Sequence, residues 1–307
     1  MMLPLLSSMV LCALGLWLLF GALATLIYRL LQPGILAIDP SQASLFLLAW
    51  LALPSFTALL TCYVLYSPDI AQWLVVGHCH VNTCSQHGPQ STLAIIPTTF
   101  LLLWTLHGIG RKLRGQWLPT RRLYKQLCLI GNGNGDFVSL GSTQPIAFTL
   151  GWLKPRIFIS AGMQAACSAQ DLECILRHES AHRQRRDNLR LFIARLLAAP
   201  LPESWSLRAW CDLKLCCEMA CDLHAARRTS RESVAAALLR VARVQQENTP
   251  SGALAFAGNA TEQRVMALIA QPQPPMAGEL VFATVAVTLL IVLALINPLH
   301  RAIELIP

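Results

Sequence analysis

The sequence predicts a mainly α-helical membrane protein in which three transmembrane helices precede, and one follows, a mixed α+β domain. Three observations support this fold class. Of the 307 residues, 54% are hydrophobic and only 13% are charged, a composition too apolar for a soluble protein. Four long apolar runs alternate with more polar segments. Basic residues gather just after the third of these runs.

Each apolar run is long enough to cross a hydrocarbon core of about 30 Å as a helix. The runs predict transmembrane helices at about 3–31, 43–66, 91–109 and 280–299. The first run could also be a signal peptide, because Ala22-Leu23-Ala24 resembles a cleavage site. No positive residue precedes that run and its apolar character continues past the site, so we expect a retained span.

Charge predicts which side of the membrane each part occupies. The loop 67–90 contains no Lys or Arg, so the positive-inside rule places it outside and the segment after the third span in the cytosol. We therefore expect a membrane region (1–109), a cytoplasmic domain (110–278) and a fourth span with a short tail (279–307), with both termini outside. The basic residues close to the third span are Arg111, Lys112, Arg114, Arg121, Arg122 and Lys125. Anionic lipids of the bilayer account for much of the net charge of +8, so no direct nucleic-acid partner is expected.

Residues 178–182 of the cytoplasmic domain have the sequence H-E-S-A-H. Ser168 followed by Asp171 has the form of a capping box, so the motif is expected on a helix. There His178 and His182 share a face one turn apart, where both imidazoles can reach one metal ion. Glu179 is offset by about 100° around the axis, the position of a general base beside a zinc-bound water. A chance pattern on a solvated helix face is the alternative, which the scarcity of histidine (8 in 307 residues) disfavours.

A second helix, predicted at about 205–228, offers a third metal ligand. Glu218 and Asp222 lie four residues apart and so share one face of this helix. Glu218 would complete a two-histidine, one-glutamate site with an open fourth position, the pattern of catalytic zinc sites. Asp222 would accept a hydrogen bond from a ligand imidazole and fix its tautomer. The alternative is an acidic surface paired with Lys214 and Arg227.

Strands are expected before the motif helix. The N-G-N-G-D segment at 132–136 predicts a hairpin connection, since a phosphate-binding loop would also require Lys-Ser/Thr. The expected strands are Phe137–Leu140, Ile146–Leu150 and Arg156–Ser160. A strand edge beside a zinc helix would hold an extended peptide by pairing with it. After the motif, Asp187 is expected to cap a helix over 189–199.

The outer loop 67–90 concentrates potential ligands, which are His78, Cys79, His80, Cys84 and His87. Outside the cytosol, Cys79 and Cys84 could form a disulfide. Imidazole and thiol ligands also suit copper or zinc, so a metal site is the alternative, and the sequence leaves both open. The cysteines of the cytoplasmic domain face a reducing compartment and are expected to be free thiols.

Taken together, these features resemble the membrane-embedded zinc metallopeptidases typified by the BlaR/MecR antibiotic-sensing signal transducers. The resemblance covers nearly the whole chain. It rests on H-E-S-A-H followed by R-R-D-N-L, on E-M-A-C-D at 218–222, on the segment 144–157, and on three spans before and one after. It implies a zincin-like domain of the gluzincin type, with one zinc ion bound by His178, His182 and Glu218 and with Glu179 as the base.

The same resemblance implies peptide-bond hydrolysis at the bacterial cytoplasmic membrane, with a small winged-helix repressor of the BlaI/MecI type as the protein substrate. The antibiotic sensors carry a penicillin-binding domain after the last span, whereas this sequence ends at Pro307, so antibiotic sensing is not expected. A protease that removes faulty membrane proteins and a non-catalytic receptor are the alternatives, and a homodimer is left open. Glu179 argues against the receptor, which would need no base. Arg264 and His224 are the candidates for stabilising the oxyanion.

Overall fold

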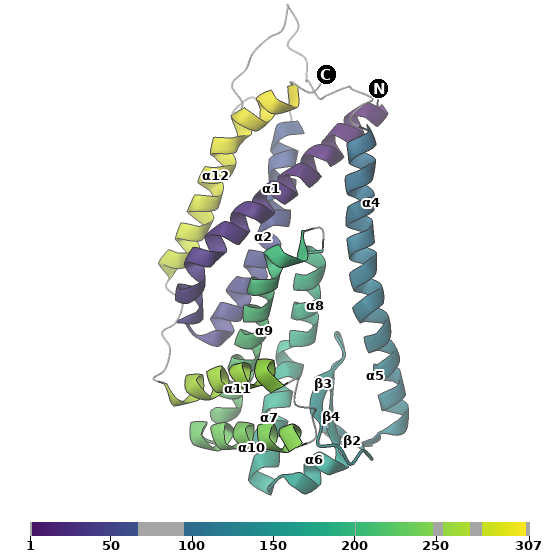
Figure 1. The fold of residues 1–307 in the computed structure, drawn as a ribbon, viewed down its shortest axis with the longest axis vertical. Helices are drawn as coiled ribbons and strands as arrows, with labels where there is room; N and C mark the ends of the chain where they lie inside the picture. The colour runs from purple at the N-terminus through teal and green to yellow at the C-terminus, as the bar shows by residue number, and fades with distance from the viewer. Residues whose placement is uncertain (1, 67–94, 200, 248–253, 271–277, 305–307) are drawn as a thin grey trace, which may run out of the picture.

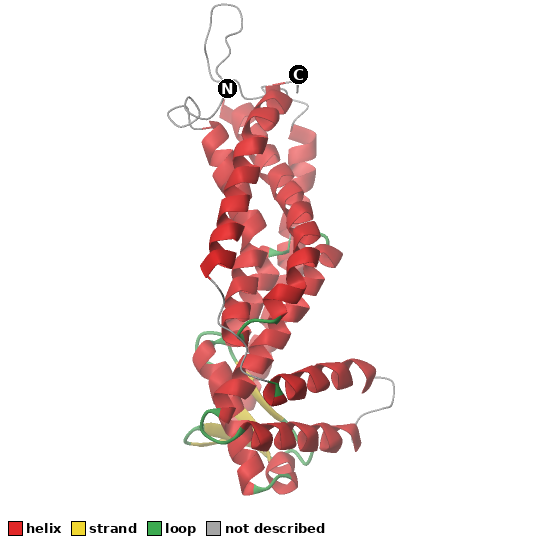
Figure 2. Cartoon of the chain, turned by 90° about the vertical axis from the view of Figure 1, so that its left-hand side faces the viewer, coloured by secondary structure: helices red, strands yellow, loops and turns green. Residues whose placement is uncertain are grey.

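The computed structural model describes the chain except for residues 1, 67–94, 200, 248–253, 271–277 and 305–307. Helices form most of the molecule, and the strands are confined to its lower part (Figure 2). The long helices of the upper part are α1 (Met2–Leu36), α2 (Pro40–Tyr66), α4 (Ile95–Lys112) and α12 (Gly278–Glu304) (Figure 1). Helices are therefore present at all four positions where the sequence predicts a span.

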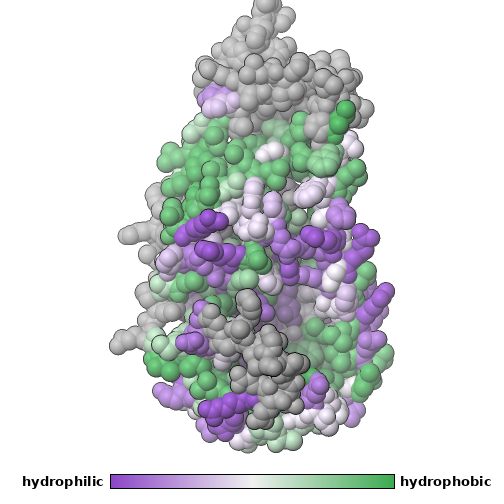
Figure 3. All heavy atoms as spheres, in the orientation of Figure 1, coloured by the Kyte–Doolittle hydropathy of each residue, from purple (hydrophilic) through white to green (hydrophobic). Residues whose placement is uncertain are grey.

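Two of these helices are long and apolar enough to cross a membrane, over Met9–Leu36 and Pro40–Val64 of the described residues. The apolar stretch of α12, Thr284–Pro298, is shorter. Figure 3 shows hydrophobic residues over the described upper part of one face, with a band of hydrophilic residues beneath them. The two long apolar helices suggest association with a membrane, and the crossing of the membrane by four helices stays a prediction.

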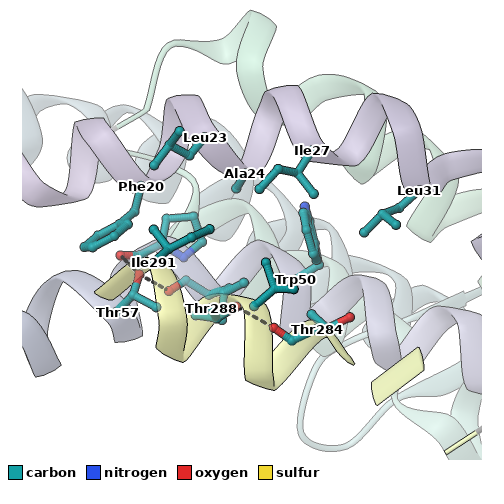
Figure 4. Close-up of a pocket in the computed structure, with 13 residues that line it drawn as sticks. Phe20, Leu23, Ala24, Ile27, Leu31, Trp50, Thr57, Thr284, Thr288 and Ile291 are labelled. Carbon is teal, nitrogen blue, oxygen red and sulfur yellow. Dashed lines mark hydrogen bonds between the residues drawn. The ribbon is translucent and has the colours of Figure 1, made fainter. Parts of the chain in front are cut away.

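The upper helices also enclose an apolar cavity of about 160 Å³ between α1, α2 and α12 (Figure 4). Phe20 and Ile291 line it from α1 and α12. Two of its threonine hydroxyls bond within their own helices: Thr288 Oγ1 donates to the carbonyl of Thr284 at 2.7 Å, and Thr57 Oγ1 donates to that of Leu53 at 2.8 Å. The lining therefore offers apolar contacts and little polar chemistry.

One hydrophobic core joins the upper helices to the domain below, because α9 (Glu203–Ala226) packs against α1 and α2. Ile35 of α1, Leu47 of α2 and Leu213 of α9 are each 0% exposed in this core. α8 (Asp187–Leu197) leads up to the α8–α9 connection, which packs closely against the upper helices. A Cβ at Gly108 of α4 would lie only 2.7 Å from the carbonyl oxygen of Ala199, so the close approach requires glycine there.

From α4 the chain passes through a π-helical turn (Leu113–Trp117) and α5 (Leu118–Ile130) to a four-stranded sheet. Its strands are β1 (Asn132–Asn134), β2 (Phe137–Leu140), β3 (Ala147–Leu150) and β4 (Arg156–Ser160), in the order β1-β2-β4-β3. β2 and β4 are parallel, while β1 pairs with β2 and β3 pairs with β4 antiparallel. β3 therefore lies at one edge of the sheet.

The predicted strands agree with this sheet to within one residue. The hairpin prediction is also confirmed, although Asn132–Asn134 are themselves a strand and only Gly135 and Asp136 form the turn. Gly135 has φ of +67°, a left-handed conformation that glycine adopts without strain.

Four more helices complete the domain: α6 (Ala161–Ala166), α7 (Ala169–Arg185), α10 (Arg231–Glu247) and α11 (Leu254–Ile269). α7 starts at the predicted capping box, in which Ser168 and Asp171 bond reciprocally. It packs on the sheet through Leu172 and Ile175, against the buried Ile159 of β4. This packing places the motif helix beside the edge strand β3.

The predicted cap of α8 is wrong. Arg186, with φ of 53°, occupies the N-cap position, and no side chain caps the helix. Asp187 is the first residue of α8, and its carboxylate points to His182 instead, at 2.9 Å from Nδ1. Because the packing of the domain buries this carboxylate beside His182 and Arg185, it pairs with their side chains instead of with the backbone amides at the start of α8.

Candidate metal centre

Two helices bring three potential metal ligands together. His178 and His182, both on α7, have their Nε2 atoms 3.1 Å apart. Glu218 of α9 lies opposite, with Oε2 at 3.5 Å from Nε2 of His178 and Oε1 at 3.7 Å from Nε2 of His182. The three ligand atoms all lie within 4.8 Å of one another. This spacing fits a single zinc ion, which binds imidazole nitrogen and carboxylate oxygen at roughly 2 Å.

The second nitrogen of His178 faces Asp222, the residue that the sequence predicts to accept a hydrogen bond from a ligand imidazole. Nδ1 of His178 lies 2.8 Å from Oδ1 of Asp222, a close ionic contact without the alignment of a hydrogen bond. Arg264 of α11 donates to both oxygens of the same carboxylate, from Nε and Nη2, at 2.8 Å each. Its Nη1 also lies 3.2 Å from Glu218. We call His178, Asp222 and Arg264 the Asp222 triplet.

His182 has an equivalent partner that the sequence analysis assigned to another role. Oδ2 of Asp187, which is 1% exposed, lies 2.9 Å from Nδ1 of His182. Arg185 Nε is 3.2 Å from both oxygens of this carboxylate. We call His182, Asp187 and Arg185 the Asp187 triplet. The sequence feature that could have indicated this partner is the aspartate of R-R-D-N, five residues after His182. In the sequence alone, that aspartate is equally consistent with a helix cap.

Cys221 adjoins the Asp187 triplet. Its Sγ lies 3.3 Å from Nδ1 of His182 and 3.4 Å from Oδ2 of Asp187. His182, Asp187 and Cys221 thus form a second group that could hold a metal ion. Burial raises the pKa of the Cys221 thiol, and the nearby Asp187 carboxylate also raises it, so the thiolate form that binds metal is disfavoured. The group of His178, His182 and Glu218 is the better candidate.

Opposite charges dominate the electrostatics of the site. Burial alone would lower the pKa of His178, but Asp222 and Glu218 outweigh it and raise the pKa to about 10. Burial is likewise outweighed at His182, where Asp187 and Glu218 raise the pKa to about 10. Burial would raise the pKa of Glu218, yet the two histidines and Arg264 hold it well below its usual value. Burial is also outweighed at Asp222 by Arg264 and His178 and at Asp187 by His182 and Arg185, so the pKa of each of these carboxyls is lowered. The three carboxylates therefore stay ionised and favour a cation between the imidazoles.

Glu179 lies beside this group and is held from the edge strand. Thr149 of β3 donates from Oγ1 to Oε2 of Glu179 at 2.8 Å and lies 2.9 Å from the Glu179 carbonyl oxygen. Asn188 of α8 donates to the carbonyl of Thr149 at 2.8 Å, which fixes β3 against the helices. His178, His182, Glu179 and Glu218 all line one cavity of about 370 Å³, which is also bordered by β3 and α10.

Comparison with known protein families identifies this region. Residues 142–268, which include the motif helix, α9 and Arg264, match the family model described as BlaR1 peptidase M56. The chain contains an M56 peptidase domain. Comparison with curated proteins and with solved structures found no match. Membership of this peptidase family suggests a metallopeptidase.

Within the M56 domain, the two residues suggested for the oxyanion have different positions. Arg264 lines the cavity, with its guanidinium committed to Asp222 and Glu218. His224 instead lines a separate cavity of about 400 Å³ with Asp39 and Arg227. The structure therefore does not bring His224 to the site.

Other predicted site residues lie elsewhere. His78, Cys79, His80, Cys84 and His87 are outside the described residues. The cysteines of the domain are free in the described part of the chain, as expected. Cys216 and Cys217 are each 1% exposed in the core between α2 and α9, which favours packing over metal binding.

Proposed function

We propose that this chain is an integral-membrane, zinc-dependent endopeptidase that hydrolyses peptide bonds on the cytoplasmic side. The observation that supports it best is one cavity that combines His178, His182 and Glu218 with Glu179 and the edge strand β3. One zinc ion bound by the three ligands would acidify a water molecule and polarise the substrate carbonyl. Asp222 and Asp187 would orient the two ligand imidazoles.

In this mechanism Glu179 is the general base. It accepts the proton of the attacking water and then delivers it to the leaving amine. The hydrogen bond from Thr149 engages Oε2 of Glu179, which leaves Oε1 for the water. Because Thr149 belongs to the edge strand, the position of the base is tied to the position of the strand proposed to hold the substrate.

The edge of β3 supports binding of an extended peptide. Ser160 N–H donates to the carbonyl of Ile146, so the alternation of antiparallel pairing directs the backbone groups of Phe148 toward β4. The backbone groups of Ala147 and Thr149 then point away from β4. Asn188 donates a hydrogen bond to the carbonyl of Thr149. The other outward backbone groups of Ala147 and Thr149 could pair with a substrate strand.

The proposed substrate is a cytosolic transcriptional repressor of the BlaI/MecI type, by analogy with the signal transducers that the sequence resembles. We also propose that the protein lies in a bacterial cytoplasmic membrane, with both of its termini outside the cytosol. It predicts that cleavage depends on Glu179, whereas metal binding does not.

The test compares newly formed protein N-termini in cells that produce the wild type or Glu179→Gln, together with the zinc content of both purified proteins and of His182→Ala. We expect a new terminus in a small DNA-binding repressor with the wild type alone, zinc in Glu179→Gln, and no zinc in His182→Ala. Scattered fragments of membrane proteins would instead indicate a protease that removes faulty membrane proteins. Unchanged zinc in His182→Ala would overturn the ligand assignment, and an identical set of termini in both cell types would contradict a protease.

A further inference from the structure

One contact of the Asp187 triplet has no part in this mechanism. Nη2 of Arg185 donates to Oγ of Ser44 at 2.8 Å, across 141 residues of sequence. Ser44 is in the first turns of α2, one of the two long apolar helices, and is 0% exposed. The contact therefore connects a candidate membrane helix to the residue that supports His182.

We propose that Ser44 and Arg185 are positioning residues, through which the start of α2 holds Asp187, and hence His182, in the geometry that binds the metal. A displacement of α2 then changes metal affinity, which gives the membrane region a direct route to the proposed peptidase site. This inference rests on the proposed function, because it concerns the same metal centre.

The chemistry of arginine makes such a link stiff. The guanidinium is planar and its donors are fixed relative to one another. Arg185 uses Nε for Asp187 and Nη2 for Ser44, so it cannot tilt toward one partner without weakening the contact with the other. Ser44 is also fixed, because its hydroxyl donates to the carbonyl of Ser41 at 2.7 Å and so presents a lone pair to Arg185.

Burial makes these contacts effective. Asp187 is 1% exposed and the side chain of Arg185 is 17% exposed, so solvent competes poorly for them. The other partners of Asp187 are Cys221 and Arg190, from α9 and α8. Among the described residues, Arg185 is thus the side chain that links the Asp187 carboxylate to α2 by hydrogen bonds.

Packing adds a second path in parallel with the hydrogen bonds. Leu47 of α2, one turn beyond Ser44, lies in one core with Leu213 and Cys217 of α9. α9 also carries Glu218 and Asp222. A movement of α2 consequently acts on α9, which holds the carboxylate ligand, and on Asp187, which supports a histidine ligand.

The experiment measures zinc affinity by competition with a chelator, using the full-length protein in lipid nanodiscs. Four proteins are compared with the wild type: Ser44→Ala, Arg185→Lys, the double variant, and Ser55→Ala as the control. Ser55 is a buried serine on the same helix whose hydroxyl contacts Leu197 instead. Lysine keeps a charge near Asp187 but cannot bridge two partners with a rigid fork.

We expect Ser44→Ala to weaken zinc binding about 3- to 10-fold, less than the 10- to 100-fold typical when the direct partner of a metal-bound histidine is lost. The double variant should bind zinc no more weakly than Arg185→Lys, because both changes break the same link. Ser55→Ala should bind zinc as the wild type does.

Zinc affinity in Ser44→Ala equal to that of Ser55→Ala would overturn the inference, even if its thermal stability fell, since a contact that is only structural would give that result. Additive losses in the double variant would also overturn it. Should Ser44→Ala fail to fold, Arg185→Lys decides, since wild-type zinc affinity in that variant excludes a positioning role. No zinc binding by the wild type would instead refute the proposed function, and this inference with it.

Discussion

The two triplets behind the candidate ligand histidines differ in what anchors them. In the Asp222 triplet, Arg264 comes from α11 and binds two carboxylates of the site, with two hydrogen bonds of 2.8 Å to Asp222 and a contact of 3.2 Å to Glu218. In the Asp187 triplet, Arg185 is divided between Asp187 and Ser44 of α2.

This difference has a consequence for how the site can be controlled. Among the described residues, the polar partners of His178 all belong to the matched M56 region, and packing is its link to the upper helices. His182 is supported by a residue that also binds the start of α2. If both histidines bind the metal, one locally anchored ligand and one remotely anchored ligand would allow the metal affinity to change while the domain stays folded.

The largest expected effect comes from removing the anchor of the Asp222 triplet. Arg264→Ala leaves the buried carboxylate of Asp222 and the partly buried one of Glu218 without this cation, and we expect it to lower the free energy of unfolding by about 3–5 kcal/mol. Denaturant unfolding of the metal-free protein, followed by near-UV circular dichroism, measures this. Arg243→Ala, at an exposed arginine of α10, is the matched control and should cost less than about 0.5 kcal/mol. A similar small loss in Arg264→Ala would show that the Asp222 triplet is not a structural anchor.

The next prediction compares the two carboxylates directly. Asp222→Asn and Asp187→Asn each remove a charge that orients a ligand imidazole, so each should weaken zinc binding about 10- to 100-fold. Asp222→Asn should have the larger effect, because it also removes the charge that holds Arg264, whose guanidinium then competes with zinc for the candidate ligand Glu218. Chelator competition provides the measurement. The opposite order would make the Asp187 triplet the main support of the metal.

A third prediction concerns Glu179, which belongs to neither triplet. Thr149→Val removes the hydroxyl that holds Oε2 and should lower kcat about 10-fold, less than the roughly 100- to 10,000-fold that a general base contributes, with zinc affinity unchanged. Peptide hydrolysis and zinc titration on the same sample separate the two. Thr149→Ser keeps the hydroxyl and should retain most of the activity. Equal losses in both variants would mean that the methyl group, and not the hydrogen bond, matters.

The smallest expected effect is that of Cys221→Ser. If zinc is bound by His178, His182 and Glu218, Cys221 contributes only packing beside Asp187, and zinc affinity should change less than about 2-fold. Stoichiometry by atomic absorption should stay at the wild-type value. Loss of the metal would instead favour the group of His182, Asp187 and Cys221 as the binding site, and would make the Asp187 triplet a ligand set rather than a support.

The sequence alone was sufficient for the parts of this protein that depend on short-range geometry. The spacing of His178 and His182 places both on one face of any helix, and Ser168 with Asp171 marks where that helix begins. Alternating apolar runs with proline and glycine at their ends located β2, β3 and β4 to within one residue. The pairing of Glu218 with Asp222 rests on the same four-residue periodicity.

The tertiary structure decided which distant side chains complete these local patterns. Asp187 could cap a helix or support His182, and only the packing of α7, α8 and α9 selects the second. Thr149 reaches Glu179 from 30 residues away, and Arg264 reaches Asp222 from 42. The contact between Ser44 and Arg185 joins segments 141 residues apart. Periodicity specifies the face of a single element, but the partner that the face meets depends on how buried surfaces of several elements fit together, and that fit has no signature within a short stretch of sequence.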